Sequence, residues 1–157
     1  MTFAQLHQVI QLAMGWTNAH LHEFRVNARR IGPFYKELEG NEELIDETKV
    51  RLHEAFLPTD RLFHYTYDFG DNWEHQLQIA PWQPAQAGAQ YPVCVAGECN
   101  CPPEDCGGVH GYQNLLAVLA DKTHSERNEW LVWLGGRYSS DSLTLTTVNR
   151  QLARRFR

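Results

Sequence analysis

The chain has 157 residues, 43% of them hydrophobic and 11% aromatic, which is typical of one folded domain rather than a disordered segment. Its formal charge of −5 disfavours binding of nucleic acid by the whole surface. No apolar run approaches the ~20 residues that cross a bilayer, and the N-terminus lacks a basic-then-apolar signal pattern. We therefore expect residues 1–157 to form a single cytoplasmic domain without a membrane partner.

The chain begins with a predicted amphipathic helix over residues 2–14. Thr2 and Gln5 have the spacing of a capping box, in which each side chain covers the other residue's exposed backbone group. The apolar residues that follow fall on one helical face, and Gly15 is the expected stop.

A turn and a strand are predicted next, because His20, His22, Phe24 and Val26 alternate with Leu21, Glu23 and Arg25. Two histidines at this spacing share a strand face and can bind a metal, although strand histidines more commonly face solvent or the sheet.

The polar and acidic residues 27–47 read as a solvated loop, with a short strand around Phe34 as the alternative. Residues 50–57 predict a short helix that Pro58 ends.

Residues 63–79 predict a β-hairpin. Aromatic residues alternate with polar ones over 63–69, and a second alternating run covers 73–79. Gly70, Asp71 and Asn72 lie between the runs and tolerate the backbone angles of a tight reversal. His75 shares the inward face of the returning strand with Trp73 and Leu77.

Three further helices are predicted after the hairpin. They cover residues 112–120, a segment that a second capping box at 123–126 opens and Gly135 ends, and residues 147–156. The order of helix, strands and helices indicates an α+β fold, a mostly antiparallel sheet with helices packed on it.

All four cysteines lie in the segment 94–112, which has no periodicity and several glycines. Such a segment needs a constraint other than regular hydrogen bonding, such as burial, a metal or a disulfide.

The hairpin YTYDFGDNWEHQLQI followed by CPPEDCGG resembles the plasmid open-reading-frame-three-like family, also labelled insertion-element passenger or TnpR-like proteins. The resemblance covers almost the whole chain and implies a module of plasmid or mobile-element type, with no settled activity. Relatives place a strand before the first helix, and its absence here implies an exposed sheet edge and a homo-oligomer.

The cysteine spacing C-x4-C-x-C-x4-C suggests a structural zinc site, since thiolates and imidazole are the ligands that zinc prefers. The expected ligands are His75, Cys94, Cys101 and Cys106, with Cys99 as the alternative ligand. The competing interpretation is a set of ordinary thiols and a core histidine.

Four carboxylates near the hairpin are candidates for acid–base or metal-assisted chemistry: Asp68, Asp71, Glu104 and Asp105. Turn and capping roles would also explain these carboxylates.

The sequence leaves two hypotheses for the function of the protein. The first is a non-catalytic binding protein, with zinc as its stabilising ion. The alternative is a metal-dependent hydrolase or nuclease at the junction of the hairpin and the segment 94–112, the cysteine loop, so the sequence leaves open whether the protein is an enzyme.

Nucleic-acid binding has support only at the C-terminus, where four arginines gather: Arg150, Arg154, Arg155 and Arg157. A basic last turn that complements a helix dipole is the simpler explanation. Residue patterns identify no protein partner.

Overall fold

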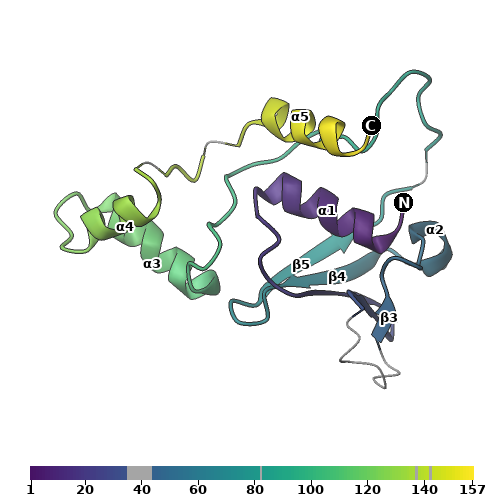
Figure 1. Cartoon of the computed structure of the whole chain (residues 1–157), viewed down its shortest axis with the longest axis horizontal. Coiled ribbons are helices and arrows are strands. Elements are labelled where there is room, and N and C mark those ends of the chain that lie inside the picture. Colours follow the sequence, from purple (N-terminus) through teal and green to yellow (C-terminus); the bar gives the residue numbers. More distant parts are fainter. Residues whose placement is uncertain (35–43, 82, 137, 142) are drawn as a thin grey trace.

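The computed structural model describes residues 1–34, 44–81, 83–136, 138–141 and 143–157. The described residues form a five-stranded sheet in the order β3-β2-β1-β4-β5 (Figure 1). Its strands are β1 (His22–Val26), β2 (Arg29–Gly32), β3 (Leu44–Asp46), β4 (Leu62–Tyr67) and β5 (Trp73–Gln78). Neighbouring strands are antiparallel, except that β2 and β3 run parallel. The single α+β domain with a mostly antiparallel sheet is thus confirmed.

Helix α1 (Phe3–Met14) begins and ends where the local sequence predicts. The Thr2 hydroxyl accepts a hydrogen bond from the Gln5 backbone, and the Thr2 backbone donates to the Gln5 amide oxygen at 2.9 Å. Gly15 ends the helix in the left-handed region at φ 75°. Phe3 is fully buried and contacts Phe24 of β1 edge-on, with ring centres 5.1 Å apart, so this helix covers one face of the sheet.

The prediction of a loop over residues 27–47 is wrong for the part that the structure describes, because β2 and β3 lie within this range. Asn27 adopts a positive φ of 55° at the turn after β1, and this allows β2 to fold back against β1. The fully buried Ile31 then pairs with Phe24 across the strands. Phe34 is exposed and outside any strand, and the remainder of the alternative strand falls on residues 35–43, outside the described residues.

The predicted hairpin is confirmed. Strands β4 and β5 pair in register from Leu62 opposite Gln78 to Tyr67 opposite Trp73. The buried side chains of β4 are Phe63, Tyr65 and Tyr67, which alternate with less buried residues as the pattern requires.

The remaining helices are α2 (Leu52–Ala55), α3 (Gly108–Ala120), α4 (Arg127–Trp133) and α5 (Leu145–Arg155). The second capping box does not form. Instead, the Asp121 carboxylate accepts hydrogen bonds from the Thr123 backbone at 2.8 Å and hydroxyl at 2.7 Å. This local bond competes with the cap, and Glu126 starts α4 without a side-chain cap.

The helices are unevenly distributed around the sheet. Helix α5 lies beside α1, whereas α3 and α4 form a pair set apart from the strands (Figure 1). On the sheet face opposite α1, strand alternation places exposed polar side chains such as Arg25, His64 and Glu74. Within the described part of the chain, no helix has the length and apolar character needed to cross a membrane.

Candidate metal centre

The turn between β4 and β5 holds Asp68 in a strained conformation. Its φ of 55° lies in the left-handed region, and one carboxylate oxygen, Oδ1, accepts the Gly70 backbone N–H at 2.9 Å. Its own N–H donates to the carbonyl of Leu21 at 2.8 Å, which ties the turn to the segment before β1. The second oxygen, Oδ2, therefore points away from the turn, toward that segment.

The cysteine loop contributes Glu104 as an anchor. Its carboxylate accepts hydrogen bonds from the Thr17 backbone at 3.0 Å and from the hydroxyl groups of Thr17 and Tyr67. The Tyr67 oxygen in turn accepts the Ala19 N–H at 3.0 Å. Burial alone raises the pKa of Glu104, but these hydrogen bonds lower the pKa below its ordinary value, so the anchor is an ionised carboxylate.

Two further contacts fasten the same loop at its ends. The indole N–H of Trp16 donates to the carbonyl of Pro102 at 3.0 Å. At the other end, the Asp71 carboxylate accepts the Gly107 N–H at 3.1 Å, where α3 begins. An anionic side chain at a helix start is favourable, so Asp71 stabilises the helix rather than facing a ligand.

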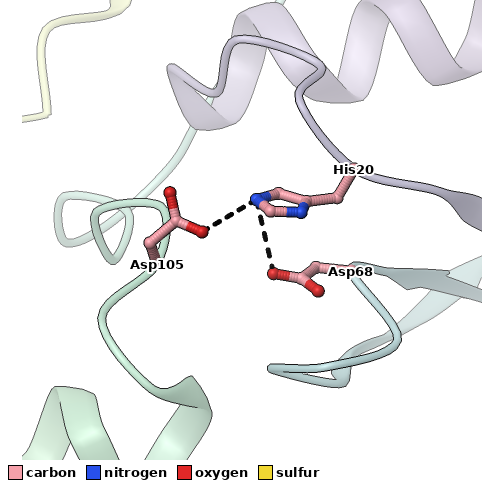
Figure 2. A group of neighbouring side chains, drawn as sticks. All are labelled: His20, Asp68 and Asp105. Carbon is pink, nitrogen blue, oxygen red and sulfur yellow. Dashed lines mark ion pairs between the residues drawn. The ribbon is translucent and has the colours of Figure 1, made fainter.

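His20, Asp68 and Asp105 converge between these anchored segments (Figure 2). The His20 Nε2 atom lies 2.9 Å from Asp105 Oδ1 and 3.6 Å from Asp68 Oδ2. Figure 2 shows one imidazole nitrogen facing both carboxylates. That nitrogen is buried, yet neither contact meets hydrogen-bond geometry. Among the described residues, this is the one group of three or more His, Cys, Asp or Glu side chains whose ligand atoms lie within 4.8 Å of one another.

Both carboxylates sit on left-handed backbone, Asp68 at φ 55° and Asp105 at φ 59°. Such conformations are uncommon outside glycine and gather at functional sites, although aspartate tolerates them better than most residues. The chain thus holds two acidic groups close to one imidazole at two strained positions.

The donor set suits a transition-metal cation. One imidazole nitrogen and two carboxylate oxygens match zinc or manganese better than magnesium or calcium, which prefer oxygen ligands throughout. The Asp68 side chain is 12% exposed and that of Asp105 is 66% exposed, so the group opens to solvent on the Asp105 side. Three protein ligands with an open side leave room for water or a substrate in the coordination sphere.

The predicted cysteine ligands do not gather in this way. Asn149 of α5 holds the Cys94 backbone through bonds of 2.7 and 2.8 Å, and Cys99 is exposed. Cys101 and Cys106 interact electrostatically with each other, and burial raises the pKa of Cys101 to about 12 and that of Cys106 to about 11. Both are therefore neutral thiols in this conformation.

His75 is half-buried, and the protein itself supplies a partner for its ring. Its Nδ1 donates to the Trp73 carbonyl at 3.0 Å, and Trp16 packs edge-on against it with ring centres 5.5 Å apart. Burial lowers the pKa of His75, so the imidazole is neutral. The set of His75, Cys94, Cys101 and Cys106 has no preformed site, and zinc binding by it stays a prediction.

All four predicted carboxylates do lie at the junction of the hairpin and the cysteine loop. Asp68 and Asp105 face the imidazole, whereas Asp71 and Glu104 fasten the loop. The alternating pattern predicts His20 in a strand, on the same face as His22, but β1 begins only at His22. The residue pattern carries no signal for its carboxylate partners.

The fold and the site define a single-domain α+β protein with a candidate cation centre where the hairpin meets a docked loop. Residues 1–147 match the plasmid pRiA4b ORF-3-like protein family, and the chain belongs to this family. It is 40% identical over 149 residues to the "Uncharacterized protein y4hQ" of Sinorhizobium fredii (strain NBRC 101917 / NGR234), covering 94% of this chain and 75% of the relative. It also resembles the crystal structure of the protein of unknown function MM3350 from Methanosarcina mazei Go1. That structure has a TM-score of 0.83 and 36% identity, over 92% of this chain and 82% of the other.

Proposed function

We propose that the chain is a divalent-cation-binding module of plasmid type, with the cation held by His20, Asp68 and Asp105. The observation that carries this proposal is the buried Nε2 atom of His20, which faces two carboxylate oxygens without a hydrogen bond. A buried polar atom without a partner costs about 1–3 kcal/mol, and a cation would supply that partner. A protonated imidazole would also attract the carboxylates, so the test has to measure cation binding itself.

Zinc is the cation we expect, because one imidazole and two carboxylates are among its usual ligands. The test is isothermal titration of zinc chloride into protein purified without a nickel column and freed of metal. Wild type should bind one zinc ion per chain. His20→Gln and Asp105→Asn should each weaken binding at least roughly tenfold, since each removes one of three ligands.

A matched control is His53→Gln. His53 is an exposed histidine that lies 3.6 Å from Glu54, so it resembles His20 in chemistry but lies outside the group. Its zinc affinity should equal that of wild type. Equal zinc affinities in all three variants and wild type would overturn the proposed site.

The cysteine ligands can be separated from this group by the same titration. Cys94→Ser should retain full zinc affinity, because Cys94 is held beside α5. If Cys94→Ser and Cys106→Ser abolish binding while Asp105→Asn leaves it intact, zinc belongs to the predicted set of His75 and cysteines instead.

A second candidate function is metal-dependent hydrolysis, which the open side of the group favours. Three protein ligands plus water is the arrangement of catalytic zinc sites, in which the cation lowers the pKa of its bound water. Zinc-loaded protein should then hydrolyse bis(4-nitrophenyl) phosphate, and Asp105→Asn should not. Stoichiometric zinc without turnover of this diester or of 4-nitrophenyl acetate would leave the non-catalytic binding module.

Strand β5 supports self-association as part of this function. It lies at the end of the sheet and, among the described strands, pairs only with β4. Unpaired strand edges present donors and acceptors that recruit another chain. Light scattering should therefore show a mass that rises with concentration, and a constant monomer mass would contradict this part of the proposal.

A further inference from the structure

The sheet face opposite α1 carries a second feature, separate from the cation centre. A hollow of about 460 Å³ opens over β1, β2, β4 and β5 and reaches the hairpin turn. The side chains that give it its character are Glu23, Arg25, Arg30, Thr66, Phe69 and Glu74. Charged groups, a hydroxyl and an aromatic ring thus meet in one concave place.

One wall of the hollow is a pair of opposed arginines. Arg25 on β1 lies directly across from Arg30 on β2, and like charges in this position destabilise a sheet. Glu23 reduces that repulsion: its carboxylate accepts the Nε–H of Arg25 at 2.8 Å and that of Arg30 at 2.7 Å. Burial alone raises the pKa of Glu23, but the hydrogen bonds from the two arginines lower it, so Glu23 is ionised. The Arg25 side chain is 67% exposed and that of Arg30 is 40% exposed, so Arg25 is the cation that this wall presents most openly to solvent.

The other wall differs in charge. Thr66 lies opposite Glu23 on one side and opposite Glu74 on the other, so Glu74 stands two strands away from the buried carboxylate. Phe69, 53% exposed, offers an apolar surface at the rim. A polyanion would meet Glu74 as well as the net charge of −5, whereas a small ligand with one negative group need approach only the arginines.

We propose that this hollow binds a small molecule with a single carboxylate or phosphate group on an aromatic body. The oxyanion lies against Arg25, whose side chain is 67% exposed and pairs with Glu23 through Nε, so that the rest of its planar fork faces outward. The aromatic body packs on Phe69, and offset or edge-on packing of two rings adds to the affinity.

The test is isothermal titration of benzoate, phenyl phosphate, inorganic phosphate and a single-stranded DNA oligonucleotide into the full chain. Benzoate or phenyl phosphate should bind at millimolar concentration or below, and the tighter of the two identifies the oxyanion. Arg25→Gln should weaken binding roughly ten- to hundredfold, the effect of losing a charge-assisted hydrogen bond. Phe69→Ala should weaken binding of the two ring compounds and leave that of inorganic phosphate unchanged.

Glu74→Gln gives the sharpest result, because removing its charge should strengthen binding of the anion. Arg155→Gln serves as the control, since Arg155 is an exposed arginine of α5 and should not affect binding. The proposal is overturned if neither ring compound binds or if Glu74→Gln weakens binding. It is also overturned if Arg25→Gln changes the melting temperature and leaves the affinity for the ring compounds unchanged. Tighter binding of the oligonucleotide than of either ring compound would also overturn it, in favour of a nucleic-acid surface.

Discussion

The imidazole rings of His7 and His22 lie parallel, with their centres 3.4 Å apart and 1° between their planes. His22 faces the buried carboxylate of Glu47 at 2.7 Å. The Nε2 of His7 lies 2.7 Å from the Asn18 amide oxygen, which can only accept, so Nε2 carries the proton. Its Nδ1 then accepts the Tyr65 hydroxyl proton at 2.8 Å, and this arrangement requires a neutral His7.

Acid should therefore destabilise the fold through His7. Burial, with the neighbouring His22, lowers the pKa of His7 from 6.5 to about 4. Between pH 6.5 and about 4 the unfolded chain binds more protons than the folded chain at this residue. The contribution of neutral His7 to the free energy of unfolding is thus complete above pH 6.5. About 3 kcal/mol of it is lost as the pH falls toward 4. Urea unfolding at several pH values measures this slope. His7→Asn should flatten it and His53→Gln should not, and an identical slope in His7→Asn would contradict the assignment.

Tyr67→Phe should impair the proposed cation centre, although Tyr67 is not one of its three proposed ligands. The Tyr67 oxygen accepts the Ala19 N–H, and its hydroxyl donates to Glu104, the residue before Asp105. Loss of such supporting bonds typically lowers metal affinity about 10- to 100-fold, and a buried group left unpaired costs about 1–3 kcal/mol of stability. Zinc titration and thermal melting test both effects. Tyr91→Phe, which alters an exposed tyrosine, is the control. Unchanged affinity in Tyr67→Phe would show that the anchor does not position the ligands.

Gly111→Ala should destabilise the protein although alanine is the better helix former. An added Cβ would lie 1.9 Å from the carbonyl oxygen of Cys106, at the point where the cysteine loop meets α3. The overpacking costs about 1–3 kcal/mol, against a gain of about 1 kcal/mol from helix propensity. Thermal unfolding gives the sign of the effect. A Gly111→Ala variant more stable than wild type would mean that the loop yields freely at this contact.

Elements fixed by neighbours in the sequence were predictable. The cap of Thr2 and Gln5 and the stop at Gly15 act within one helical turn, and the hairpin follows from strict alternation around a short turn. The pairing of β2 with β3 is of another kind. Leu44–Asp46 is only three residues long and runs parallel to β2, so no local turn announces it.

The candidate site also contains residues that the local sequence predicts and a residue whose role it does not predict. The four carboxylates were predicted because each belongs to a dense polar motif, but only the structure separates Asp68 and Asp105, which face His20, from Asp71 and Glu104, which fasten the loop. His20 is 48 positions from Asp68 and 85 from Asp105 along the chain. Its role depends on how the loop docks, and that docking uses hydrogen bonds whose partners have no fixed spacing.

The C-terminal arginines should give weak, salt-sensitive nucleic-acid binding at most. Arg154 and Arg155 are exposed in the last turn of α5. Each phosphate contact contributes about 0.7–0.9 to the slope of log affinity against log salt, so Arg154→Ala with Arg155→Ala should reduce the slope by roughly 2. Fluorescence anisotropy with labelled DNA measures it. Tight binding that survives the double substitution would place the contact surface elsewhere.

The proposed cation centre is completed only when the cysteine loop docks on the hairpin, because that loop carries Asp105, whereas His20 and Asp68 are already held together by the pairing of β1 with β4 and by the bond from Asp68 to Leu21. Unfolded and partly folded chains therefore have no such centre, and a cation would recognise the finished fold alone. Its effect should be kinetic as well as thermodynamic: zinc should slow unfolding while leaving the rate of folding unchanged, if the loop docks after the main barrier. The ion would then stabilise the contact that forms last during folding and has to break first during unfolding.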